Sequence, residues 1–189
     1  MSGRQGRPKP RPDWRGAVKL LLSFHQNETK GRLETVSHDD TWVDIYDPPT
    51  APMATVIFVP GLAIRGREDP RIRRLGWALC TAGLRALIPD IPSIRALKIS
   101  ASQPAEVNAL LKSLAQDRAV VTTDDIALMS VSFSSVFVLR AALDGVLGDR
   151  VSALGLIGGY FDIEKVADFL ITSERADPYG RLLIARSFF

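Results

Sequence analysis

The segment ALMSVSFSSVF (residues 127–137) passes from strand-like to helix-like sequence within a few positions. The apolar run DIALMSV (125–131) is typical of a buried strand, and SSVFVLRAALDGVLG (134–148) is apolar almost all round, as in a buried helix. A strand that turns sharply into a helix exposes the residue at the turn above the sheet edge. The sequence places Ser132 at that turn.

Two interpretations of Ser132 stay open on this short segment alone. A nucleophile at such a turn needs small residues two positions to either side, and Ser130 and Ser134 are small, although serine lacks the backbone freedom of glycine. The N–H groups of the following helix would then favour a nearby oxyanion. The same residues also fit a polar turn in which Ser132 or Ser134 simply caps the helix.

Strands and helices alternate on both sides of this turn. Four buried strands are predicted, over 54–61, 84–90, 125–131 and 151–160. Helices are predicted after them, over 69–83, 103–117, 134–148 and 162–171. Crossovers of this length give parallel pairing and a right-handed wind. The fold class is therefore α/β, with a doubly wound, mostly parallel sheet and helices on both faces.

Three segments precede this alternation. GRLETVSHDDTWVDIYDPP (31–49) predicts two short antiparallel strands that form a hairpin at one edge of the sheet. AVKLLLSFHQ (17–26) predicts a short helix packed on the body. Residues 1–15 are rich in Pro, Gly and Arg and cannot bury a core, so we expect a disordered basic tail. Residues 16–189 then form a single domain.

The charge and composition narrow the function classes. The net charge of the whole chain is +3. The tail holds five basic residues and one Asp, and the body holds 19 basic and 20 acidic residues, so the positive charge belongs to the tail. The body therefore lacks the excess of positive charge that is typical of nucleic-acid-binding domains. The tail is interpreted either as a segment that contacts nucleic acid or another anionic surface, or as a solvated arm without a partner. No apolar run approaches the roughly 20 residues of a membrane span. No secretory signal is recognisable, so a cytoplasmic location is expected.

The lone cysteine of the sequence indicates neither an internal disulfide nor a reactive thiol. Cys80 is the only cysteine, which excludes an internal disulfide, and it falls in an apolar helical pattern. We interpret it as a small core residue with an unreactive thiol. We expect no cofactor and no metal. A nucleotide-binding function is disfavoured because the chain has neither a G-x-G-x-x-G nor a G-K-[ST] phosphate loop.

A second loop converges on the same sheet edge as Ser132. In an open parallel sheet, ligands bind beyond the carboxyl ends of the strands. In VPGLAIRG (59–66), a strand ending in Pro-Gly can turn its next N–H groups towards that edge. Acyl transfer needs two such donors around the developing oxyanion, and the N–H groups of Leu62 and Phe133 are the natural pair. A plain turn containing glycine explains the loop equally well.

Together these segments resemble the α/β-hydrolase fold family over about residues 31–171. The resemblance lies in their order and spacing, through the edge hairpin, VPGLAIRG, DPRIRRLGWALCTAGLRALIPD (69–90), MSVSFSS (129–135) and ALGLIGGYFD (153–162). It implies that Ser132 is the nucleophile, that the N–H groups of Leu62 and Phe133 form the oxyanion hole, and that the substrate is a small-molecule ester or similar acyl compound. The family usually has His-Gly where Pro60-Gly61 stands here, and both elbow glycines are serines.

The histidine of the family's triad has no counterpart after Ser132. The only histidines are His25 and His38, both before the core strands, and we expect solvated or structural roles for them. Asp162, just after the fourth core strand, is the candidate acid, and helix capping explains it equally well. A serine without a base is a weak nucleophile. The sequence therefore leaves open whether the chain is an enzyme.

The resemblance also implies further strands after residue 160, where only about thirty residues remain. We interpret the chain as a truncated hydrolase with its C-terminal strands missing and an uncovered sheet edge that invites association. Three functions follow: an esterase-type serine hydrolase, a non-catalytic ligand- or protein-binding module, or a fragment of a longer or split hydrolase. The arginines that follow the VPGLAIRG loop fit either an acidic substrate or a solvated helix face; they are Arg65, Arg67, Arg71, Arg73 and Arg74.

Overall fold

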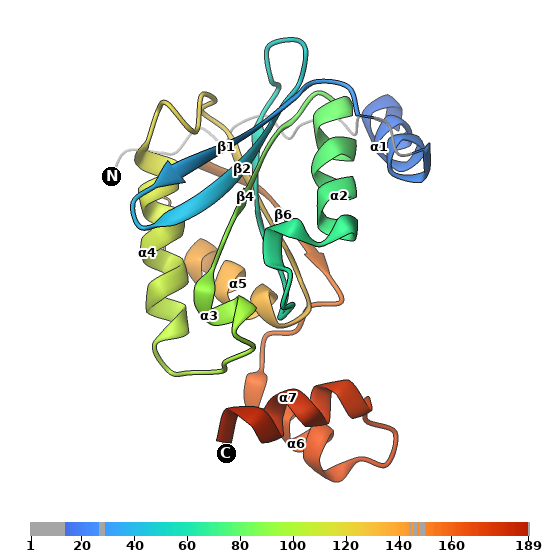
Figure 1. The fold of residues 1–189 in the computed structure, drawn as a ribbon, viewed down its shortest axis with the longest axis vertical. Coiled ribbons are helices and arrows are strands. Elements are labelled where there is room, and N and C mark those ends of the chain that lie inside the picture. Colours follow the sequence, from blue (N-terminus) through green and yellow to red (C-terminus); the bar gives the residue numbers. More distant parts are fainter. Residues whose placement is uncertain (1–13, 27–28, 144, 146, 148–149, 189) are drawn as a thin grey trace, which may run out of the picture.

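A six-stranded sheet forms the centre of the chain (Figure 1). The structure is a computed structural model that describes residues 14–26, 29–143, 145, 147 and 150–188. The strands are β1 (Arg32–His38), β2 (Thr41–Asp47), β3 (Thr55–Val59), β4 (Arg85–Pro89), β5 (Ile126–Val131) and β6 (Val151–Ile157). Their order across the sheet is β1-β2-β4-β3-β5-β6.

The pairing confirms the predicted mixed sheet with an antiparallel edge hairpin. β1 pairs with β2 and β2 with β4 in the antiparallel sense, whereas β4, β3, β5 and β6 are parallel neighbours. In this register Val59 lies opposite Ser130 on β5. The carboxyl ends of the four parallel strands therefore meet at one edge of the sheet, where the loops after β3 and β5 begin.

Helices cover both faces of the sheet. They are α1 (Trp14–Gln26), α2 (Pro70–Thr81), α3 (Pro92–Arg95), α4 (Gln103–Gln116), α5 (Ser135–Leu143), α6 (Ile163–Thr172) and α7 (Pro178–Phe188), with short 3₁₀ turns η1 (Gly66–Glu68) and η2 (Ser132–Ser134). One apolar core lies between the sheet and α3, α4 and α5, and the other lies between the sheet and α2. α6 and α7 lie beyond the carboxyl edge of the strands (Figure 1).

The central strand β3 shows why the apolar runs predicted parallel strands so well. All five of its residues are buried, because it has β4 on one side, β5 on the other and helices over both faces. α2 begins at Pro70 after the cap Asp69, as the Asp-Pro signal predicts. The helix predicted over 134–148 is shorter, since α5 ends at Leu143.

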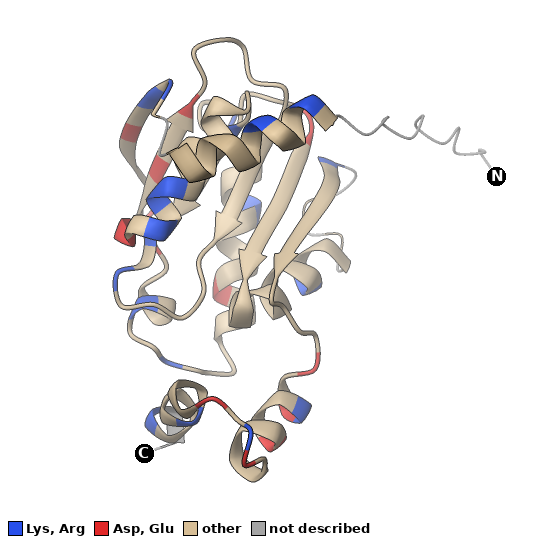
Figure 2. Cartoon of the chain, turned by 90° about the vertical axis from the view of Figure 1, so that its right-hand side faces the viewer, with Lys and Arg blue, Asp and Glu red and all other residues tan. Residues whose placement is uncertain are grey.

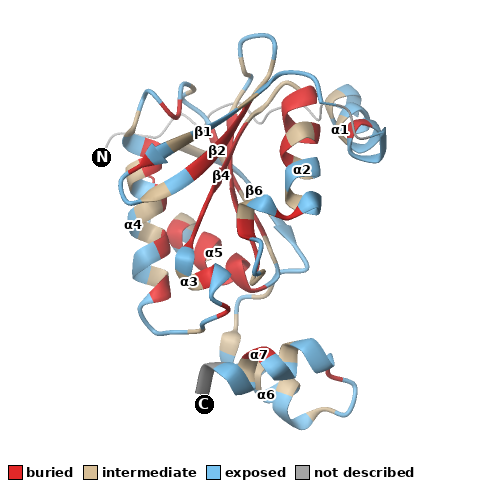
Figure 3. Cartoon of the chain, in the orientation of Figure 1, coloured by how far each residue is buried: buried red, intermediate tan, exposed pale blue. Residues whose placement is uncertain are grey.

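The prediction that the fourth core strand is buried is wrong. Five of the seven residues of β6 are exposed, and in Figure 3 the strand carries the exposed colour. β6 is an edge strand that pairs only with β5 among the described residues. Its composition, with no charged residue, suits burial, but burial needs a neighbour on the open side.

Two further expectations concern the ends of the molecule. The basic tail was expected over residues 1–15; residues 1–13 lie outside the described residues, and residues 14 and 15 open α1. The helix expected over 17–26 packs against α2. No helix within the described part of the chain combines the length and apolar character that crossing a membrane requires.

Candidate active site

The turn between β5 and α5 holds Ser132 in an uncommon backbone conformation. Its φ is +56°, in the left-handed region that non-glycine residues seldom adopt. β5 ends at Val131 in extended conformation, and η2 starts directly at Ser132. The Ser132 side chain is exposed, while its neighbour Phe133 is buried. This is the sharp strand-to-helix turn that lifts a side chain above the sheet edge.

The other serines of the turn hold it together. Ser134 Oγ donates to the carbonyl oxygen of Pro60, which ties the turn to the loop after β3. Ser130 Oγ donates to Ser135 Oγ at 3.2 Å, so the last residues of the strand and the first of the helix are linked. All three hydroxyls belong to fully buried residues and have partners. These serines are structural, and only Ser132 points outward.

The loop after β3 packs directly on this turn. A Cβ on Gly61 would lie 3.0 Å from the carbonyl oxygen of Val131 and 3.7 Å from Ser132 Cβ, so glycine permits the close approach. Leu62 follows immediately. The structure therefore brings Leu62, Ser132 and Phe133 to one place, where all three line the same cavity.

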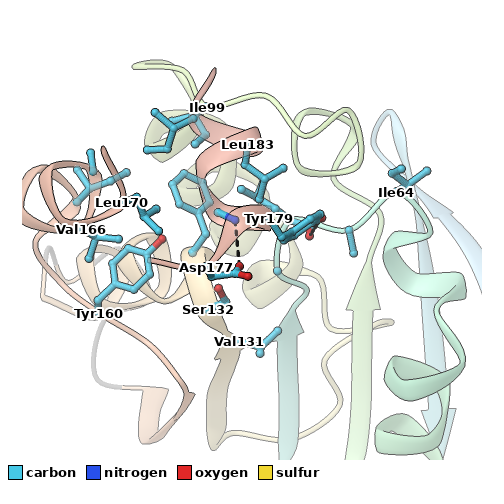
Figure 4. Close-up of a pocket in the computed structure, with 18 of the residues that line it drawn as sticks. Ile64, Ile99, Val131, Ser132, Tyr160, Val166, Leu170, Asp177, Tyr179 and Leu183 are labelled. Atoms are coloured by element: carbon cyan, nitrogen blue, oxygen red, sulfur yellow. Dashed lines mark hydrogen bonds between the residues drawn. The ribbon is translucent and has the colours of Figure 1, made fainter. Parts of the chain in front are cut away.

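The cavity above Ser132 has a volume of about 920 Å³ (Figure 4). Ser132 lies at its floor, and the opposite wall comes from α6 and α7. Most of the lining is apolar and includes Leu62, Ile64, Ile72, Ile99, Val131, Ile163, Val166, Leu170, Leu183 and Ile184. An apolar enclosure with a few polar groups is the usual form of a small-molecule site.

The polar groups of the cavity come from several elements. Tyr179 Oη donates to the carbonyl oxygen of Leu62 at 3.4 Å and so connects α7 to the loop after β3. The carboxylate of Asp177 accepts from the N–H of Gly180 at 3.0 Å at the start of α7 (Figure 4). Burial raises the pKa of Tyr160. At neutral pH this phenol is therefore neutral.

The five arginines after the VPGLAIRG loop lie in different parts of the structure. Arg65 and Arg71 line the cavity and are exposed, whereas Arg67 turns away and contacts Asp44 on β2 at 2.7 Å. Arg73 and Arg74 are exposed on α2. The five arginines therefore do not form one anion site.

Asp69 at the start of α2 is held by its neighbour Arg71. It accepts from the Arg71 backbone N–H at 2.9 Å and from the guanidinium at 2.8 and 3.0 Å, and these bonds lower the pKa of Asp69 from 3.8 to about 2. A carboxylate whose pKa is lower in the folded than in the unfolded state stabilises the fold at pH values above its unfolded-state pKa. This stabilisation is lost as the pH falls towards the folded-state pKa.

Asp69→Ala is therefore expected to lower the free energy of unfolding by about 1 kcal/mol near neutral pH, as for other N-caps. The deficit relative to the unmodified protein should shrink as the pH falls from 3.8 towards 2. Urea unfolding across this range measures both. Asp124→Ala, at an 89% exposed carboxylate, is the control and should cause little change. A deficit that is constant with pH would contradict the assignment.

The predicted acid and the two histidines are not among the residues that line the cavity. Asp162 caps α6, where Oδ1 accepts from the N–H of Lys165 at 3.0 Å, and this bond lowers its pKa. His25 is exposed on α1. His38, at the end of β1, is buried. Neither histidine nor Asp162 is among the residues that line the cavity, and an acid role for Asp162 stays a prediction.

His38 takes part in a different serine–histidine–aspartate contact. Its Nε2 lies 2.9 Å from Ser113 Oγ and its Nδ1 lies 3.2 Å from Asp117 Oδ2. Ser113 Oγ also donates to Asp39 Oδ2 at 2.5 Å. These bonds tie the β1–β2 hairpin to the end of α4, so His38 has the structural one of the two roles that the sequence left open.

Cys80 lies in the interior of the protein. Cys80 is buried in α2, as predicted, and burial raises its thiol pKa to about 11, so the thiol stays protonated and unreactive. Within the described ranges, no three His, Cys, Asp or Glu side chains are grouped so that they could hold a metal ion.

Sequence reasoning missed the wall formed by α7. Asp177 followed by Pro178 is a cap-and-first-turn signal, and it marks the start of that helix in the structure. Leu183 is buried, and it lines the cavity together with Ile184 and Leu170 of α6. The signal identified a helix, but nothing in it indicated that the helix would lie over Ser132.

The chain is similar in structure to several solved proteins, among them an esterase and a dienelactone hydrolase. It matches the Francisella virulence factor BioJ with a TM-score of 0.56 and 15% identity, over 76% of this chain and 50% of that one. It matches brefeldin A esterase, a bacterial homologue of human hormone sensitive lipase, with a TM-score of 0.52 and 13% identity, over 74% of this chain and 47% of that one. It also matches dienelactone hydrolase from Anabaena variabilis (0.50, 20%, 73% and 67%). No protein-family model and no curated protein matches this sequence.

The structural likeness covers about three quarters of this chain in each case. This chain spans about half the length of two of these structures and two thirds of the third. At 13–20% identity this likeness shows the fold, which in this chain is a mixed six-stranded sheet with helices on both faces. The chain therefore has the α/β-hydrolase fold.

Proposed function

We propose that the chain carries the nucleophile and oxyanion-binding part of an esterase-type acyl hydrolase, with Ser132 as the nucleophile. One observation supports this best: Ser132 is an exposed, left-handed serine at the end of β5, on the floor of an apolar cavity. A helix cap needs neither a positive φ nor a cavity. A strained residue at such a place is typical of functional sites.

The proposed reaction uses three residues that line the cavity, Leu62, Ser132 and Phe133. Ser132 Oγ attacks the carbonyl carbon of a small-molecule ester, and its proton passes to a general base. The N–H groups of Leu62 and Phe133 would donate to the oxygen on which negative charge develops, next to the N-terminal end of the η2–α5 segment. The alkoxide leaves with the proton, and water then attacks the acyl-serine and releases the acid.

The base is the part that the cavity lining lacks. No histidine follows Ser132 in the sequence, and neither His25 nor His38 lines the cavity. The proposal therefore assigns the histidine to a second polypeptide or to the remainder of a longer chain. The uncharged edge of β6, with Leu154 and Ile157 46% and 47% exposed, is the proposed contact for that segment, because an open strand edge pairs readily with another strand.

Fluorophosphonate labelling tests this proposal. We expect slow labelling at Ser132 in the chain alone, and faster labelling, by at least about tenfold, when imidazole is added. A positioned base is worth about 10²–10⁴-fold, of which free imidazole recovers a part. Ser132→Ala should abolish the label, whereas Ser152→Ala, at an exposed serine of β6, should not. A folded protein that shows no Ser132-dependent label with imidazole would contradict the proposal.

A non-catalytic role is the second candidate. The size and apolar lining of the cavity favour it, since both suit a bound apolar molecule whether or not chemistry follows. In that case, titration calorimetry would show a medium-chain alcohol binding with equal affinity to the unmodified protein and to Ser132→Ala. Labelling with imidazole would then be absent from both.

A further inference from the structure

Helix α1 presents its apolar side to solvent. Trp14, Val18, Leu21 and Leu22 are 75%, 52%, 66% and 52% exposed. Their spacing of four, three and one places them along one stripe of the helix. Large apolar side chains scattered singly on a surface need no explanation, but a contiguous stripe of them marks an interaction surface. We call these four residues the α1 stripe.

Among the described residues, the body covers this stripe only in part. α1 packs against α2, yet its only buried residue is the small, polar Ser23, and Leu20 is the residue that reaches the core cluster beneath α2. In Figure 3, α1 is largely in the exposed colour. A helix that served only to cover the core would turn its leucines inward. α1 is therefore oriented for a partner on its outer side.

The charge around the stripe is positive. α1 contains Arg15 and Lys19 and no acidic residue, and Figure 2 shows basic positions in blue on the helices. Both basic residues border a shallow groove together with Trp14, Val18 and Leu22. The sequence before the helix adds further positive charge through Arg4, Arg7, Lys9 and Arg11 against a single Asp13. A basic border around a Trp- and Leu-containing apolar face is the composition of helices that lie in the interface of an anionic bilayer.

We propose that α1 binds anionic lipid surfaces, with the α1 stripe at the boundary between headgroups and acyl chains and Lys19 next to the lipid phosphates. This surface is separate from the cavity above Ser132, and the inference does not depend on the proposed hydrolase activity. The fold leaves the helix able to lie flat, because its outer side carries no other element of the described chain (Figures 1 and 3).

Charge distinguishes lipid from the other occupants of such a stripe. In a pair of α1 helices from two copies, the basic residues of each helix would face those of the other, and like charges repel. Nucleic acid would satisfy the charges, but Val18, Leu21 and Leu22 would gain little, since single strands stack on aromatic side chains rather than on aliphatic ones. An anionic bilayer satisfies both the charges and the aliphatic side chains.

Vesicle flotation with the full chain tests the inference. We expect the protein to float with phosphatidylglycerol–phosphatidylcholine vesicles and to stay below with pure phosphatidylcholine. The double variant Leu21→Ser/Leu22→Ser should weaken binding by at least about tenfold, because apolar burial is lost. Lys19→Gln should weaken it by about fivefold, the effect of one basic residue near an anionic surface.

A matched control separates this effect from general surface hydrophobicity. Leu143→Ser removes a 72% exposed leucine from α5 and should leave flotation unchanged. Circular dichroism should show every variant folded, since all of these side chains are exposed. Equal binding to neutral vesicles, or no loss in the double variant, would overturn the inference. So would a dimer, or a complex with single-stranded DNA, that disappears in the double variant without any vesicle binding by the unmodified chain.

Discussion

Ser132→Gly is expected to lose all fluorophosphonate labelling and yet to be more stable than Ser132→Ala by about 1 kcal/mol. Both variants lack the hydroxyl, so they differ only in the Cβ methyl group and in its effect on the backbone conformation. With φ at +56°, alanine stays in the left-handed region at a cost of about 1–2 kcal/mol, which glycine does not incur. The unfolded chain of the glycine variant has more conformational freedom, which lowers the stability of that variant by about 0.4–1 kcal/mol and offsets part of this advantage.

The sign of this difference is what identifies a strained residue. At an ordinary helical position the order is reversed, and glycine is about 1 kcal/mol less stable than alanine. Ala109→Gly, at an exposed position in the interior of α4, provides that comparison in the same protein. Urea unfolding of the three variants and the unmodified chain gives the values. An alanine variant at residue 132 that is the more stable of the pair would show that the turn is relaxed.

The stability expected of Ser132→Gly has a bearing on function. If a serine were needed only to cap α5, glycine could replace it with little loss, and no pressure would keep a side chain at this φ. A residue that costs stability where it stands, and that faces a cavity, is explained by what its side chain does there. The pair of variants therefore weighs the two interpretations of Ser132 independently of any substrate.

Two kinds of feature could be predicted from the sequence: those that a local run of residues determines, and those that follow from the geometry of a parallel sheet. β3 and β5 are apolar runs that become fully paired central strands, so composition and environment agree. The turn at Ser132 followed because a strand and a helix with no linker between them leave only a sharp turn. The approach of Leu62 to this turn followed from the shared edge at which parallel strands end.

The features that could not be predicted depend on the tertiary neighbours of a strand, helix or side chain, which its local sequence does not determine. β6 has the composition of a buried strand, yet the sequence of the strand does not say whether a neighbour covers it. α1 has enough leucine to suggest packing on the body, but its stripe turns outward. His38 meets Ser113 across 75 positions of sequence, a contact that only the tertiary fold defines.

Arg67→Met is expected to lower the free energy of unfolding by about 3–5 kcal/mol, the usual effect of removing one partner of a buried ion pair. The Arg67 guanidinium lies 2.7 Å from Asp44 Oδ1, and the Asp44 side chain is 1% exposed. Thr35 Oγ1 donates to the same oxygen at 2.7 Å, and Asp44 Oδ2 has no partner among the described residues. Without Arg67 the carboxylate keeps one hydrogen bond in an apolar layer.

Arg67 also fixes the loop that carries Leu62, because η1 follows that loop directly and Asp44 anchors it to β2. Labelling of Ser132 should therefore fall together with stability. Arg118→Met is the control, since this arginine pairs with Asp124 in solvent and its loss should cost less than about 1 kcal/mol. An equal loss in both variants would show that the buried position of Asp44 is not the cause.

Asp44→Leu/Arg67→Met separates the two contributions of the pair. A buried ion pair is weak evidence for stability in itself, because the desolvation of both charges offsets their attraction, so an apolar pair of similar volume should recover most of what Arg67→Met loses. Urea unfolding measures this recovery. If the double variant recovered stability but not labelling, the ion pair would serve to place the loop beside Ser132. If it stayed as unstable as the single variant, the uncompensated charge on Asp44 would not explain the loss, and the packing of the Arg67 side chain would.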